Sequence, residues 1–287
     1  MDLYIVLSLI SGVLLGFFYI AKKQVLKKSD VIAVLAVYTV INSLINCVDY
    51  KVAFETDKTI LIYIFIKAVI IYIGWMLSGK AIKELPLSIS SPLGILSPVF
   101  TVIIGILILH EELGILQIVG ILIIFGSYYF IGRVGKAEVG DIFKNIYVYY
   151  MAIAMFLGAI SATMDKLLLK DVKVEQLQFW FYLFMSILYM ITILIINFIK
   201  KYQNKPLVKF EFTYMIIIVG VLLYLADKIY FYAVKFPDSN ISIVMPLRYV
   251  SIIISTILGG IIFKEQNISL KFKYMIGIVI GIVLIFI

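Results

Sequence analysis

The sequence predicts an all-α polytopic membrane protein with ten transmembrane helices, arranged as two inverted five-helix repeats. Three observations support this fold class. Hydrophobic residues make up 63% of the chain and charged residues only 15%, against roughly a quarter charged in soluble domains. Apolar runs of about 20 residues, long enough to cross a bilayer as a helix, follow one another along almost the whole chain. Finally, one polar stretch within these runs occurs twice.

The apolar runs and the breaks between them define the expected helices. The predicted spans are 2–21, 30–48, 59–82, 86–109, 114–132, 145–169, 176–199, 212–235, 237–263 and 270–287. A hydrophilic break divides them five and five, so we expect a first unit at 1–134, a connecting loop at 135–144 and a second unit at 145–287. Because each half has an odd number of spans, the second half enters the membrane from the opposite side, which makes the repeat inverted.

The repeated stretch lies at the third and fourth spans and again at the eighth and ninth. In the first copy it comprises Ala81–Lys83, Leu87–Leu93 and Glu111, and in the second copy Ala233–Lys235, Ile241–Leu247 and Glu265. Lys22–Lys23 in the first span likewise corresponds to Asp165–Lys166 in the sixth. A duplicated membrane unit is typical of carriers, because alternating access is readily built from two similar halves around a shared site.

Prolines mark the same places in both copies. Pro86 and Pro237 are expected just inside the fourth and ninth helices, where a missing N–H costs nothing. Pro92 and Pro246 lie two turns deeper. An interior proline bends a helix and frees a carbonyl, which is tolerated where protein or a polar cavity satisfies that group. A packing kink is the alternative, but the neighbouring serines, Ser90 among them, favour a cavity.

These segments resemble a known family. The run Ala81–Phe100, then His110–Leu113 and Gln117–Gly120, is similar to the EamA-type module of the drug/metabolite transporter superfamily. The resemblance extends to the second half, where it is weaker because Lys264–Gln266 replaces the acidic pair and no second proline matches Pro98. It implies a ten-helix carrier with a cavity lined mainly by spans one to four and six to nine. It names no substrate.

Charges at membrane depth are the best indicators of a site, because each costs several kcal/mol unless paired or hydrated. Lys67, Asp227 and Arg248 lie inside the third, eighth and ninth spans. At 1.5 Å of rise per residue, each is roughly 12 Å from the membrane face reached by the loop between spans eight and nine. The three residues therefore share one layer, and Asp227 and Arg248, on consecutive antiparallel helices, are expected to meet.

Polar residues near this layer complete the expected substrate-binding set. Asn42 and Asn46 lie on one face of the second span, and Ser90 and Tyr224 are further candidates. Lys67 and Arg248 against Asp227 leave one positive charge unmatched, which favours anionic or zwitterionic solutes. The alternative is a structural Asp227–Arg248 clasp with Lys67 reaching toward the surface.

Further positions extend this interpretation. We interpret Pro92, Pro246, Glu111 and Glu265 as kink and gating positions. Asp165 and Lys166, near the end of the sixth span, either extend the site or face the lipid headgroups, and we favour the headgroups.

Several classes of function lack support in the sequence. The formal charge of +8 is attributed to Lys and Arg side chains in loops at the lipid headgroups and does not indicate nucleic-acid binding. Cys47 and His110 are the single cysteine and histidine, so no disulfide framework, thiolate cluster or metal site is expected. The sequence offers no nucleophile–base arrangement or phosphate-binding loop, so neither an enzyme nor a cofactor is expected.

The sequence therefore predicts a secondary transporter of small organic metabolites, working by alternating access in a prokaryotic plasma membrane. It could be a uniporter, an exchanger or a proton-coupled carrier, and a monomer or a homodimer. The alternatives are a flippase for a lipid-linked substrate and an exporter of cationic drugs. Orientation stays open: the excess of Lys and Arg in loops opposite the termini places the termini outside, whereas the resemblance implies termini in the cytoplasm.

Overall fold

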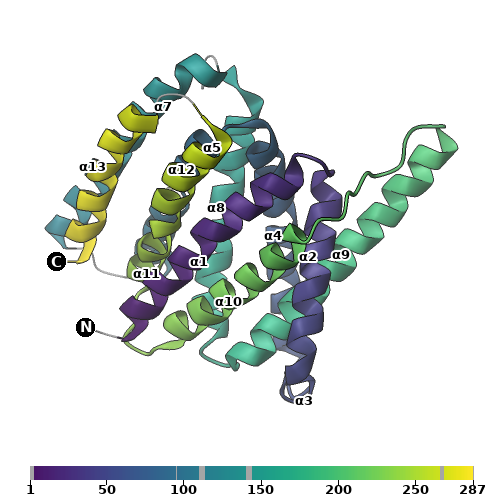
Figure 1. Ribbon diagram of the computed structural model, residues 1–287. Helices are drawn as coiled ribbons and strands as arrows, with labels where there is room; N and C mark the ends of the chain where they lie inside the picture. Colours follow the sequence, from purple (N-terminus) through teal and green to yellow (C-terminus); the bar gives the residue numbers. More distant parts are fainter. Residues whose placement is uncertain (1–2, 95, 110–113, 140–143, 266–267, 287) are drawn as a thin grey trace.

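The computed structural model describes residues 3–94, 96–109, 114–139, 144–265 and 268–286, and its regular structure there is helical (Figure 1). The elements are α1 Leu3–Leu26, α2 Val31–Asn46, a 3₁₀ turn Cys47–Asp49, α3 Tyr50–Ala53, α4 Lys58–Glu84, α5 Leu87–Leu93, α6 Leu96–Leu109, α7 Ile115–Val139, α8 Ile146–Leu168, α9 Val174–Tyr202, α10 Met215–Lys235, α11 Ile241–Arg248, α12 Val250–Phe263 and α13 Ile268–Phe286.

Within the described residues, seven helical segments are long and apolar enough to cross a membrane. They are α1, Val31–Ala53, α4, α8, α9, α10 and Ile241–Phe263. A shorter apolar helix, Val99–Ile108, lies within α6. The prediction of an all-α polytopic membrane protein is confirmed, whereas the count of ten transmembrane helices stays a prediction.

The fourth and ninth predicted spans are each interrupted near their interior proline. Pro92 lies inside α5 and Pro246 inside α11, and each helix ends one or two residues later, at Leu93 and Arg248. The chain then continues as α6 and α12. A proline ring clashes with the preceding turn and removes a hydrogen bond, so the sequence predicts a bend near each of these positions.

The start of each interrupted span differs from the prediction. Pro86 is the N-cap of α5 and lies one residue outside the helix. Pro237 lies in the turn after α10, and α11 begins only at Ile241. The expectation that Pro237 lies inside a helix is therefore wrong. Backbone hydrogen bonds explain why: Ser239 N donates to the Phe236 carbonyl and closes a turn around this proline.

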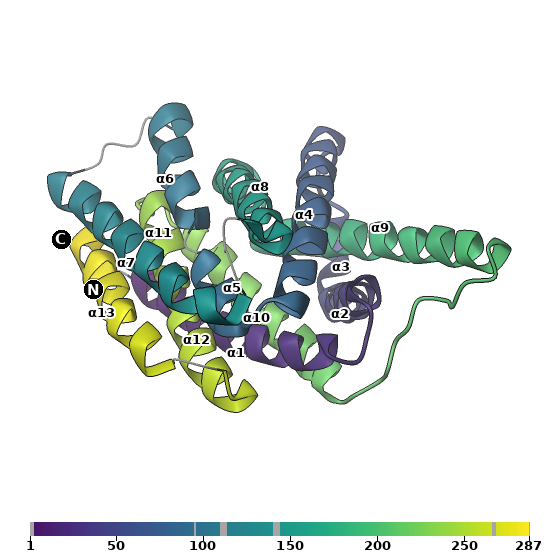
Figure 2. The same cartoon turned by 90° about the horizontal axis from the view of Figure 1, so that it is seen from above.

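Several helices continue beyond the predicted spans, among them α1, which ends at Leu26. α7 reaches Val139 and so extends into the hydrophilic segment 135–144 that the sequence predicts as a loop. α9 reaches Tyr202, and its C-terminal part extends beyond the other helices (Figures 1 and 2). Polar residues with good helix propensity thus prolong these helices beyond their apolar parts. A prediction based on hydrophobicity does not detect such polar helix ends.

The segment after α9 returns to the turn between α1 and α2. Asp30 N donates to the Lys209 carbonyl at 2.9 Å, and Lys209 N donates to Asp30 Oδ2 at the same distance. Lys28 and Glu211 form an exposed ion pair of 2.8 Å. Their hydrogen bond raises the pKa of Lys28 and lowers that of Glu211 relative to their ordinary values. These contacts hold the long connection at one end of the bundle.

The first helix of each predicted unit packs into the other unit. α1 lies against α10, α11 and α12, and α8 lies against α4, α5 and α6. α7 and α13 pack against each other at one edge of the molecule (Figures 1 and 2). The halves of the chain are therefore interlocked rather than merely adjacent.

Glycines allow α1 to approach the second half closely. A Cβ at Gly12 would lie 2.5 Å from the Arg248 carbonyl oxygen, and one at Gly16 would lie 2.6 Å from Ile254 Cβ. Small residues at such positions are how membrane helices bring their backbones together. The contact between α1 and the α11–α12 break therefore depends on these two positions having no side chain.

Candidate functional site

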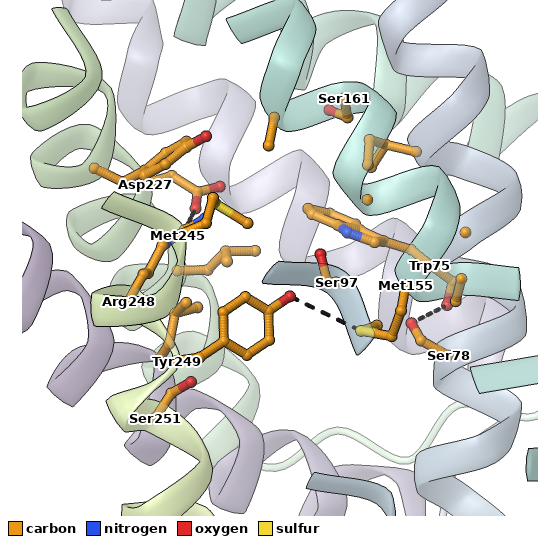
Figure 3. A pocket seen from close by; sticks show the side chains of 18 of the residues that line it. Trp75, Ser78, Ser97, Met155, Ser161, Asp227, Met245, Arg248, Tyr249 and Ser251 are labelled. Carbon is orange, nitrogen blue, oxygen red and sulfur yellow. Dashed lines mark hydrogen bonds and ion pairs between the residues drawn. The ribbon is translucent and has the colours of Figure 1, made fainter. Parts of the chain in front are cut away.

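A cavity of about 130 Å³ lies among helices of both halves. Residues of α1, α4, α8 and α10 line it, together with residues at the α5–α6 and α11–α12 breaks. Figure 3 shows Arg248, Tyr249 and Asp227 facing Trp75 and Met155 across it. The Tyr249 hydroxyl lies 3.8 Å from the Met155 sulfur. The cavity thus has one wall from each half of the chain.

Asp227 and Arg248 meet in this wall, as their depths in the sequence predict. They form a hydrogen-bonded ion pair between α10 and α11. Arg248 Nε also donates to Ser11 Oγ at 3.0 Å, and its guanidinium lies 4.1 Å from the centre of the Tyr230 ring. The Tyr182 hydroxyl donates to the second Asp227 oxygen. Both charges are therefore held by several partners.

Lys67 pairs with Asp165 rather than remaining free. Lys67 Nζ lies 3.2 Å from Asp165 Oδ1, and the two side chains are only 3% and 5% exposed. The ammonium also lies 3.8 Å from the centre of the Phe181 ring. The expectation that Asp165 faces the lipid headgroups is wrong, because α8 packs on α4 and brings the carboxylate to a buried cation.

This pairing also changes the charge count drawn from the sequence. Lys67 and Arg248 each have a carboxylate partner, Asp165 and Asp227 respectively. Tyr230 joins the pairs, since its ring lies beside Arg248 and its hydroxyl donates to Asp165 Oδ2 at 3.3 Å. The surplus positive charge assigned to Lys67 and Arg248 is therefore absent, and the layer that they form with the two carboxylates is neutral.

The remaining predicted polar residues lie outside the main cavity. Asn42 is fully buried, and its amide donates to the Tyr38 carbonyl at 2.8 Å and the Gly220 carbonyl at 3.1 Å. Asn46 donates to the Asn42 carbonyl at 2.8 Å. The Asn42 amide thus connects α2 to α10, the Asn46 amide bonds within α2, and α2 contributes no residue to the described cavity wall.

Tyr224 and Ser90 occupy separate surroundings. The Tyr224 hydroxyl accepts from Lys228, which also pairs with Asp49 at 3.2 Å. Ser90 lines a smaller pocket that Tyr249 also lines. The structure thus brings Lys67, Asp227 and Arg248 to one cavity and leaves Asn42, Asn46, Ser90 and Tyr224 elsewhere.

The kink and gating positions show one clear capping contact. Glu265 follows the end of α12, and its carboxylate accepts from the backbone N–H groups of Leu87 at 2.6 Å and Ser88 at 2.8 Å. It therefore caps the start of α5 from the other half of the chain. Glu111 lies outside the described residues.

Two lysines at corresponding positions of the repeat cap the C-terminal ends of helices. Lys23 Nζ donates to the carbonyls of Ile82 at 2.5 Å and Leu85 at 2.7 Å, at the end of α4. Lys166 Nζ donates to the carbonyls of Val234 at 3.3 Å and Phe236 at 3.2 Å, at the end of α10. A cation at a helix C-terminus satisfies free carbonyls and interacts favourably with the helix dipole. The expected headgroup position of Lys166 is therefore wrong.

Several cavity residues were not selected from the sequence. Lys22, Tyr19 and Tyr230 all line the cavity. One feature of the sequence indicates Lys22: it corresponds to Asp165 in the repeat. Corresponding positions in two copies are expected at corresponding depths in the membrane. The tyrosines had no such signal, because many tyrosines in this chain lie at helix surfaces.

Comparison with known proteins supports the repeat and the class. The model of the EamA-like transporter family matches residues 2–133 and again 145–287. An uncharacterized protein of Methanocaldococcus jannaschii is 35% identical over 126 residues, which cover 43% of this chain and 92% of that protein. A solved crystal structure described without a function has a TM-score of 0.70 at 12% identity, covering 99% of this chain and 98% of its own; it shows the fold alone.

Two matches to one family model, together covering nearly the whole sequence, account for the duplicated segment and the apolar helices alike. The family suggests a membrane transporter of small molecules and gives no indication of an enzyme. The chain belongs to the EamA-like transporter family, within the drug/metabolite transporter superfamily.

Proposed function

We propose that the protein is a secondary transporter of small zwitterionic or anionic organic solutes in the plasma membrane. Its ten transmembrane helices form two inverted units that rock around a central site. The carrying observation is the cavity between the halves, with the neutral layer of Lys67, Asp165, Asp227 and Arg248 in its wall. A shared site between two similar units is what alternating access requires.

The chemistry of the wall supports solutes that carry both signs of charge. In a site of low dielectric, the Asp227–Arg248 pair can open so that Asp227 accepts a solute ammonium, while a cation of the cavity wall binds the solute carboxylate. The cavity of about 130 Å³ suits a small molecule, since an engineered cavity of about 150 Å³ holds benzene. Amino acids fit both requirements.

The inverted arrangement is supported by packing and by length. α1 packs into the second half and α8 into the first, and Lys23 and Lys166 cap α4 and α10 in the same manner. The relative from Methanocaldococcus jannaschii matches over 126 residues, about the length of one family unit. Such a protein is what a single unit before duplication would resemble.

We propose uniport or exchange rather than proton coupling. Both cavity carboxylates have a cationic partner, so a proton would have to replace an existing ion pair. An imposed proton gradient should therefore leave the extent of solute accumulation in proteoliposomes unchanged. Accumulation that follows the gradient would assign a proton-coupled mechanism instead.

A thermal-shift screen of the purified protein tests the substrate class. Amino acids, sugars, nucleotides and cationic drugs are compared at equal concentration, and stabilising compounds are then tested for uptake into proteoliposomes. We expect amino acids or their anionic relatives to stabilise the protein and to be transported. Stabilisation by cationic drugs alone, or by a lipid-linked compound alone, would contradict the proposal.

Arg248→Ala provides the matched test of the site. It removes the cationic partner of Asp227, so we expect binding of the stabilising amino acid to be lost. Lys205→Ala, at an exposed position in the connection after α9, is the control and should bind normally. Equal binding by both variants would reduce Arg248 to a structural clasp between α10 and α11.

A further inference from the structure

Lys22 differs from the other cations near the cavity. It lies in the last two turns of α1, is only 3% exposed and lines the cavity. Its ammonium lies 5.4 Å from the centre of the Phe18 ring and 5.6 Å from that of Tyr38. Within the described part of the chain, no carboxylate forms an ion pair with it. Rings at this distance compensate only weakly for a buried ammonium.

The neighbouring lysines show what a satisfied buried ammonium looks like in this protein. Lys23, the next residue, donates to three backbone carbonyls. Lys67 has the Asp165 carboxylate at 3.2 Å. Lys22 lacks both kinds of partner among the described residues and instead borders the open space of the cavity.

The cavity charges are therefore unequal. Among the described lining residues, Lys22, Lys67 and Arg248 are basic and Asp165 and Asp227 are acidic. The two acids are already paired with Lys67 and Arg248. When Lys22 is protonated, its positive charge is the remaining one, and a buried charge without a counter-ion is unfavourable until an anion joins it.

We propose that Lys22 is the anion-binding subsite of the transporter and binds the carboxylate or phosphate group of the solute. The neutral layer then contacts the remainder of the molecule. This inference rests on the proposed transport function and deepens it by naming the residue that binds the anionic group of the solute, whether or not the solute also carries a cationic group. A zwitterion and its keto acid should both bind, and the corresponding amine should bind poorly.

Three probes with one carbon skeleton test this assignment: L-leucine, 4-methyl-2-oxopentanoate and 3-methylbutylamine. Their dissociation constants are measured by thermal-shift titration of the full chain in detergent. Lys22→Met should weaken binding of the two carboxylates by roughly 10- to 100-fold, the range expected for a lost charge-assisted hydrogen bond. It should leave binding of the amine unchanged or stronger.

Two further variants separate charge from structure. Lys22→Arg keeps the positive charge and should retain most carboxylate binding. Lys27→Met removes an exposed cation from the same end of α1 and should bind as the unsubstituted chain does. Lys22→Met should also raise the melting temperature of the ligand-free protein, because it removes an unpaired buried charge; a merely structural lysine would give the opposite sign.

The outcomes distinguish the subsite from the transport function. Unchanged carboxylate binding by Lys22→Met, or equal loss for all three probes, overturns the subsite. So does an unsubstituted chain that neither carboxylate stabilises. If other solutes are transported in that case, the transport function stands and Lys22 is not its anion site; if no solute in the wider screen is transported, the proposed function itself fails.

Discussion

The buried ion pairs of this protein have lost their hydration, and the geometry of each pair decides whether it stabilises the fold. Lys67 and Asp165 are almost completely buried, and each has a second partner, the Phe181 ring and the Tyr230 hydroxyl. Removing charges from water costs several kcal/mol per ion, which mutual attraction and added hydrogen bonds offset. The stability of the protein is therefore far more sensitive to the removal of one partner than to the replacement of the whole pair.

Asp165→Asn tests this sensitivity. The substitution leaves the Lys67 ammonium buried without its counter-ion, so we expect a loss of about 3–5 kcal/mol in the free energy of unfolding. Replacing both residues, as Lys67→Met with Asp165→Asn, should restore much of that loss. Reversible unfolding in detergent measures both variants. Equal stability of Asp165→Asn and the unsubstituted protein would show that the pair is solvated in the membrane.

The two pairs differ in how readily the sequence reveals them. Asp227 and Arg248 are on consecutive helices, so their depths could be compared across a single turn. Lys67 and Asp165 are on α4 and α8, which meet only because the halves interlock. Depth and periodicity give the level of a residue in the membrane, but they do not say which helices are neighbours. That limit explains why Asp165 was expected at the surface.

At the scale of elements, the turn between α4 and α5 leaves two helix ends inside the protein that need partners. Glu265 supplies one for α5, and Lys23 supplies one for α4. Lys264, just before this glutamate, adopts a left-handed backbone conformation with φ of 53°, which ends α12. The proline positions were readable from the sequence, whereas the distant capping groups were not.

Glu265→Ala removes the acceptor of two backbone N–H groups at the start of α5. We expect faster amide hydrogen exchange in Leu87–Leu93 and a loss of about 1.5–3 kcal/mol in stability, as for other hydrogen bonds to a charged group. Hydrogen-exchange mass spectrometry measures the first effect. Glu84→Ala, at the exposed end of α4, is the control. Similar exchange in the two variants would remove the capping role.

Gly16→Ala tests the close approach of α1 to α12. The new Cβ would lie 2.6 Å from Ile254 Cβ, so the helices must move apart, with an expected loss of about 1–3 kcal/mol. Gly126→Ala, in α7, is the matched control, because a Cβ added there would have no heavy atom of a neighbouring element within 4 Å. It should be neutral or slightly stabilising, since alanine favours a helix. Thermal unfolding of the two variants gives the comparison; equal stability would contradict the close approach.

At the scale of the whole molecule, inverted units place equivalent loops on opposite sides of the membrane. Lys27 follows the first helix of one unit and Lys170 follows the first helix of the other, and both are exposed. On a Cys47→Ser background, Lys27→Cys and Lys170→Cys should therefore react with a membrane-impermeant maleimide from opposite sides. Labelling both from the same side would show parallel units and would contradict the ten-helix inverted arrangement.

The interlocking of the halves also bears on how the protein is made. α1 is synthesised before its partners α10, α11 and α12, which follow much later in the chain. Until those helices are made, the face of α1 at Gly12 and Gly16 lacks the α11 and α12 residues that it packs against. Lipid or the insertion machinery must accompany this helix until α10, α11 and α12 have been made. The packing of α1 is therefore complete only when the second half of the chain has been made. A chain truncated before α10 would expose the unpacked face of α1 to cellular quality control.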